Sequence, residues 1–137
     1  MNEFATSFKV YKAVCPGMPR DHHAIFVETN TNTSGRVFHV TGTIAQGMVF
    51  EEKDLKFPDF SYSYENMMLL GAVDKADIDQ FRQVCLSIPP PKKQFEGPKR
   101  LYPKEALRHC QQWVAEAIDA LKGQGVLKAS QGEEQGA

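Results

Sequence analysis

The sequence contains few cysteines, and their number and spacing exclude two common kinds of small protein. Its 137 residues include three, Cys15, Cys85 and Cys110. An odd number of cysteines with no CxxC pair argues against a disulfide framework and against a zinc site built on cysteines. We therefore expect an intracellular, cytoplasmic protein with free thiols.

The chain also lacks an excess of either charge and any long apolar run. Lysine and arginine together number 16 and aspartate and glutamate 17, a formal net charge of −1. This balance argues against nucleic acid or an anionic membrane as a partner. The longest apolar stretch, Met67–Val73, is interrupted by Gly71 and is far shorter than the roughly 20 residues of a transmembrane helix. The first residues lack the apolar segment of a secretory signal, so we expect neither a signal nor a transmembrane segment.

Motifs for metals and cofactors are absent as well. The acids Glu51, Glu52 and Asp54 do not have the spacing of metal ligands, and no glycine loop of the GxxxxGK type is present. The sequence therefore predicts no metal and no cofactor.

The first half of the chain is rich in residues that favour strands. Polar turn residues at 29–35 separate two apolar segments with strand character, and this pattern predicts a hairpin with a long loop. Gln46 and Gly47 are expected to form a turn that leads into a third short strand. The strands are expected over residues 8–14, 24–27, 36–43, 48–50 and 59–64.

The second half changes to helical spacing. Apolar residues predict a helix over about 78–88, with Asp74 placed to cap it and Pro89–Pro91 to end it. A second helix is expected over 103–122, ended by Gly123. Strands followed by helices indicate an α+β fold with a small antiparallel sheet or partial barrel. We expect one domain over residues 1–128 and a polar, disordered tail over 129–137.

Cys110 and the histidines are the candidates for chemistry. Cys110 lies near the start of the second predicted helix, where unpaired N–H groups favour a thiolate. His22 and His23 open one strand and must point to opposite faces, while His39 lies in the next strand on the face opposite Phe38. The hairpin can place His39 beside one of the first two. The alternative for each residue alone is a buried core side chain.

These segments resemble one known family. His22 to Val27 is similar to the H-x-A-I-Y-V strand of the lecithin:retinol acyltransferase and H-Rev family, and Val37 to Val40 to its second strand. His109 to Val114 is similar to the N-C-E-x-F-V start of its helix. The order His, His, Cys is that of the circularly permuted, papain-like NlpC-type superfamily. The resemblance implies a permuted papain-like domain.

The resemblance also implies roles for individual residues. Cys110 would be the nucleophile, His22 the general base, and His39 the group that orients His22. His23 is the alternative base if the strand is shifted by one residue. Trp113 and His109 are candidates for the substrate pocket, and packing in the core is the favoured alternative for Trp113.

The function implied is a thiol-dependent hydrolase or acyl transferase that acts on an amide or an ester. A small molecule, a lipid or a peptide is the expected substrate, and an amide is slightly favoured because no basic amphipathic surface is apparent. The first alternative is an inactive papain-like binding module in which Cys110 is an inert core thiol. The second is a small-molecule tailoring enzyme that uses the histidines of the same cleft for acid–base chemistry.

Overall fold

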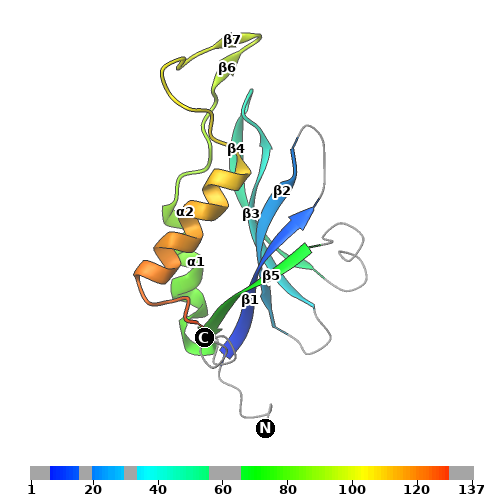
Figure 1. Ribbon diagram of the computed structural model, residues 1–137, viewed down its shortest axis with the longest axis vertical. Coiled ribbons are helices and arrows are strands. Elements are labelled where there is room, and N and C mark those ends of the chain that lie inside the picture. The colour runs from blue at the N-terminus through cyan, green and yellow to red at the C-terminus, as the bar shows by residue number, and fades with distance from the viewer. Residues whose placement is uncertain (1–6, 16–19, 30–33, 56–65, 130–137) are drawn as a thin grey trace.

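Five antiparallel strands form one sheet in the computed structural model, which describes residues 7–15, 20–29, 34–55 and 66–129 (Figure 1). Their order across the sheet is β4-β3-β2-β1-β5, and all neighbours are antiparallel. The predicted β2–β3 hairpin is confirmed. The strands are β1 (Ser7–Cys15), β2 (His22–Glu28), β3 (Gly35–Thr43), β4 (Gly47–Leu55) and β5 (Asn66–Asp74).

Strand β5 was not expected from the sequence. It contains the apolar stretch Met67–Val73 and pairs along its length with β1. A continuous apolar run has no polar alternation, so its periodicity does not distinguish a strand from other buried structure. The edge strand expected over 59–64 lies outside the described residues.

Both helices pack on one face of the sheet (Figure 1). A short 3-10 helix, η2 (Lys75–Asp77), leads into α1 (Ile78–Ser87), and α2 (Cys110–Gly123) packs against β2, β3 and α1. Between the helices lies a small hairpin of β6 (Phe95–Glu96) and β7 (Lys99–Arg100). The main core joins the two layers, and its largest fully buried members are Trp113, Phe38, Phe81, Ile25 and Leu121. The fold is therefore α+β, as predicted.

The start of α2 differs from the prediction. The helix expected from residue 103 begins at Cys110, and residues 103–109 are not helical. The buried side chain of Gln94 explains the difference, because it binds both backbone groups of Arg108. Its Oε1 accepts from the Arg108 N–H at 2.9 Å, and its Nε2 donates to the Arg108 carbonyl at 2.8 Å. These bonds occupy the groups that a longer helix needs, so Cys110 becomes the first helical residue.

Asp74 also differs from the prediction. It precedes η2, but its carboxylate makes no capping hydrogen bond. It accepts instead from Lys128 Nζ at 2.9 Å. The backbone of Lys128 pairs with that of Ala72, so the segment after α2 returns to β5. Val126 and Leu127 are buried on the way, as the sequence indicated.

Candidate functional site

Two of the predicted histidines meet in a chain of hydrogen bonds that ends on a carboxylate. Nε2 of His22 lies 2.9 Å from Nδ1 of His39, and Nε2 of His39 lies 2.7 Å from Oε1 of Glu51. The three residues come from three adjacent strands, and His39 and Glu51 are direct partners in the β3–β4 ladder. We call His22, His39 and Glu51 the triad.

The carboxylate determines which ring nitrogens of the triad carry protons. An ionised Glu51 only accepts, so Nε2–H of His39 donates to it. In neutral His39 the other nitrogen, Nδ1, is then an acceptor, and Nε2–H of His22 donates to it. Neutral His22 therefore keeps an unprotonated Nδ1. The triad presents this nitrogen as its base.

Burial keeps both histidines neutral. Burial is the largest of the causes that lower the pKa of His22 to about 4, and electrostatic interactions with His39, His23 and Lys53 act in the same direction. Burial also lowers the pKa of His39, although its hydrogen bond to Glu51 opposes this effect. That same hydrogen bond lowers the pKa of Glu51. At neutral pH the triad thus consists of two neutral imidazoles and one carboxylate.

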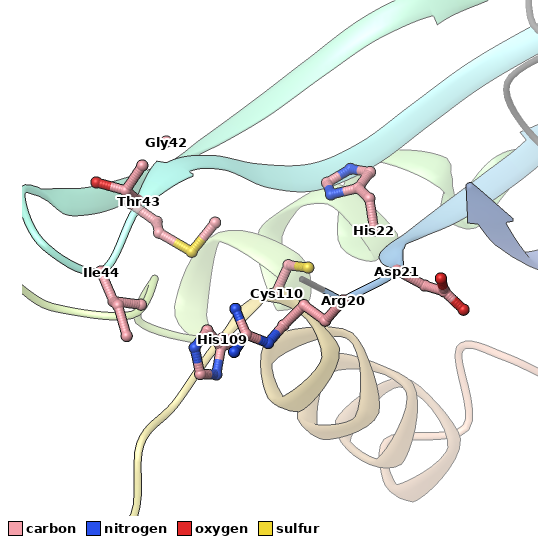
Figure 2. Close-up of a pocket in the computed structure, with 9 residues that line it drawn as sticks. Arg20, Asp21, His22, Gly42, Thr43, Ile44, His109 and Cys110 are labelled. Atoms are coloured by element: carbon pink, nitrogen blue, oxygen red, sulfur yellow. The ribbon is translucent and has the colours of Figure 1, made fainter. Parts of the chain in front are cut away.

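Cys110 shares a cleft with His22 (Figure 2). The cleft has a volume of about 320 Å³ and opens where β2 starts, β3 ends and α2 begins. Figure 2 shows the Cys110 thiol and the His22 imidazole on the same side of this hollow, on α2 and β2 respectively. Its lining is formed by Arg20, Asp21, His22, Gly42, Thr43, Ile44, Met48, His109 and Cys110.

A hydrogen bond between the residue after Cys110 and the residue before His22 links the segments that carry these two side chains. Gln111 directly follows Cys110, and its Nε2 donates to the carbonyl of Asp21 at 3.1 Å. Asp21 directly precedes His22. Cys110 itself is 6% exposed, and within the described residues no hydrogen bond joins its thiol to His22. The start of α2 is thereby fixed against the start of β2.

The remaining predicted residues occupy different places. His109 lines the cleft, and its backbone N–H donates to Oε1 of Gln112 at 2.7 Å, which caps α2. Trp113 is fully buried, donates from Nε1 to the carbonyl of Ile88 at 2.9 Å, and is not among the residues that line the cleft. His23 is partly buried and does not line it either.

Sequence reasoning missed Glu51 and the position of Cys15. Glu51 was considered only as a metal ligand, yet the short β3–β4 turn places it directly opposite His39. Its neighbour Glu52 points to the other face, where it binds Arg36 and Arg82. Cys15 is the direct partner of His22 in the β1–β2 ladder, so a second thiol lies one strand away from the base.

Comparison with known proteins yields one match. A family of unknown function, DUF6540, matches residues 10–128. The chain belongs to this family. No curated protein and no solved structure matches it. The matched region of this DUF6540 protein includes the whole triad, the cleft and Cys110.

Two further observations concern the described part of this DUF6540 protein. Neither of its helices has the length and apolar character needed to cross a membrane. No cluster of three or more histidine, cysteine, aspartate or glutamate side chains in the same residues has the arrangement of a metal site.

Proposed function

We propose that this protein is a thiol-dependent hydrolase or acyl transferase with a permuted papain-like domain, acting on an amide or an ester. The observation that carries the proposal is the triad, which ends at a cleft that Cys110 also lines. A half-buried, oriented imidazole that lines the same cleft as a cysteine at a helix start is an arrangement that can activate a thiol. The chain order of His22, His39 and Cys110 agrees with the permuted family.

The proposed reaction has two steps. In the first, Nδ1 of His22 takes the proton of Cys110, and the sulfur attacks the acyl carbon of the substrate. The tetrahedral intermediate collapses, the bond to the leaving amine or alcohol breaks, and His22 returns the proton to that group. In the second, His22 deprotonates water or an acceptor alcohol or amine, which attacks the thioester. The thiol is then released with its proton.

The start of α2 supplies the stabilisation of the oxyanion. The first intrahelical hydrogen bond runs from the Trp113 N–H to the His109 carbonyl. The N–H groups of Cys110 and Gln111 precede it and have no intrahelical acceptor. Donors fixed in this way stabilise charge that develops on a substrate oxygen near the sulfur.

His39 and Glu51 act through His22. His39 holds the ring of His22 with Nδ1 unprotonated, and Glu51 stabilises the positive charge that spreads over the two rings when His22 takes a proton. This compensates for burial, which by itself disfavours the imidazolium. Glu51 is partly exposed, so its contribution is smaller than that of a fully buried carboxylate.

Formation of an acyl-enzyme tests the proposal. The protein is incubated with p-nitrophenyl acyl esters and with N-acyl amides, and intact mass and product release are measured. We expect an acyl adduct on Cys110 that is absent in Cys110→Ala, while Cys15→Ala, the matched control, retains it. Product release by Cys110→Ala at the wild-type rate would support the tailoring enzyme instead. A folded wild-type protein that forms no adduct with any of these substrates would support the binding module.

A further inference from the structure

The segment between the two helices carries a concentration of positive charge that the composition of the whole chain conceals. Residues 92–106, which we call the basic arm, contain five lysines and arginines and two glutamates, a net charge of +3. The whole chain carries −1, so the rest of the chain carries −4. The arm includes β6 and β7 and extends beyond the end of the sheet, near the start of α2 (Figure 1).

Both acids of the arm are already neutralised within it. Glu96 binds Lys93 Nζ at 2.9 Å, and Glu105 binds Lys92 Nζ at 3.3 Å. Within the described residues, the other three cations, Lys99, Arg100 and Lys104, have no carboxylate partner. In the described part of the chain, Arg100 donates to the backbone carbonyl of Glu105, and its buried Nε finds no acceptor there. The arm therefore has three positive charges left for an external partner.

Exposed apolar side chains lie among these charges. Leu101 is 38% exposed and Tyr102 is 41% exposed, and Lys99, Arg100 and Lys104 flank them along the chain. Lys92 Nζ lies 3.8 Å from the centre of the Tyr102 ring, which holds the ring in place. Leucine and tyrosine between basic residues are typical of segments that lie at the boundary between lipid headgroups and acyl chains.

The arm is joined to the rim of the cleft. Gln94 N–H donates to the carbonyl of Ile44 at 2.7 Å, and Met48 N–H donates to the carbonyl of Pro91 at 2.8 Å. Ile44 and Met48 both line the cleft that contains Cys110. A surface bound by the arm would therefore lie beside the cleft.

We propose that the basic arm docks this protein on an anionic lipid surface. The surface binds the unpaired charges of Lys99, Arg100 and Lys104, and Leu101 and Tyr102 enter the interface. A projecting hairpin fits a flat surface better than it fits an extended acidic peptide, which needs a groove lined by free cations. The two cations beside the hollow at the base of the arm, Lys92 and Arg108, are already paired with Glu105 and Glu116. This binding does not depend on the reaction proposed for Cys110.

Vesicle sedimentation tests the proposal. The full chain is mixed with vesicles of phosphatidylcholine alone or of equal parts phosphatidylcholine and phosphatidylserine. We expect binding to the second kind only, weakened by added salt. The double variant Lys99→Gln/Lys104→Gln changes two exposed side chains that make no ion pair in the described structure. Since each cation near an anionic membrane contributes a factor of about five, we expect binding about 30-fold weaker.

The matched control removes the same charge elsewhere. Lys9→Gln/Lys122→Gln changes two exposed lysines, one near the start of β1 and one at the far end of α2, and neither is ion-paired in the described residues. We expect the affinity of this control for the anionic vesicles to lie within a few-fold of that of the wild type. The affinity of Leu101→Ser should be lower than that of the control. Equal loss in the control and arm variants would overturn the proposal. A wild-type protein that does not bind the vesicles would also overturn it. If that protein instead binds polyglutamate, the partner of the arm would be an acidic protein.

Discussion

The dependence of stability on pH tests the triad without knowledge of any substrate. Burial holds the pKa of His22 at about 4 in the folded protein, whereas the ordinary value is 6.5. As the pH falls below 6.5, the unfolded chain binds a proton at His22 and the folded protein does not. The stability that neutral His22 contributes is thus complete above pH 6.5 and is lost as the pH falls toward 4.

The two pKa values set the size of this effect. Their full difference corresponds to about 3.4 kcal/mol of unfolding free energy. His22 is only partly buried, so solvent screening reduces this figure to roughly 1.5 kcal/mol. Most of that loss falls between about pH 7 and about pH 4.5, a range in which small domains can still be unfolded reversibly.

Urea unfolding of the wild type and of His22→Gln, each at about pH 7 and about pH 4.5, measures the effect. The variant has no imidazole at this position, so its stability should fall by roughly 1 kcal/mol less than that of the wild type over this range. Acidic groups elsewhere contribute equally to both proteins. His23→Gln, on the same strand but outside the triad, should differ less from the wild type. The same loss of stability in His22→Gln and in the wild type would refute the placement of His22 in the triad.

Three further predictions follow from individual contacts. Glu51→Gln removes a charge-assisted hydrogen bond to His39, and the rate of Cys110 acylation should fall about tenfold, the equivalent of about 1.4 kcal/mol. Gln111→Ala removes the bond to the Asp21 carbonyl and should slow the same acylation about fivefold, whereas Gln83→Ala on α1 should not. Trp113→Phe should lower the unfolding free energy by about 2 kcal/mol in urea, because a buried indole and its bond to Ile88 are lost. An unchanged value in any of the three measurements contradicts the role given to that residue.

The sequence pattern predicted that His39 lies beside either His22 or His23, and the structure shows that the partner is His22. The polar loop at 29–35 predicted a hairpin, and alternation placed His39 on the face opposite Phe38. The structure confirms the hairpin and brings Nε2 of His22 to 2.9 Å from Nδ1 of His39. These inferences rest on local periodicity and turn chemistry, which a single sequence contains.

Glu51 and the start of α2 were not accessible in the same way. Glu51 lies beyond the three residues expected for its strand, so its partnership with His39 required the full length of β4 and the register of the β3–β4 turn. The first residue of α2 depends on Gln94, which lies 14 positions from Arg108 in the sequence. The spacing of apolar residues does not predict such a contact between a distant side chain and the backbone.

The distribution of charge is a third example. The net charge of −1 does not reveal the local excess of positive charge in residues 92–106, because a sum over the whole chain hides it. The ion pairs of Lys92 and Lys93 show which cations of the basic arm are already paired, and Figure 1 shows the β6–β7 hairpin beyond the end of the sheet. Pairing of this kind is visible only once the fold brings the side chains together.

The rate at which iodoacetamide labels each cysteine, with and without His22, tests the central claim most directly. Cys85 is the internal reference, because burial raises its pKa to about 12 and keeps it inert. We expect rapid labelling of Cys110 in the wild type and labelling at least about tenfold slower in His22→Gln, since the base is lost. Cys110 that labels at the same slow rate in both proteins, or His22-dependent labelling of Cys15 alone, would contradict the assignment of Cys110 as the nucleophile.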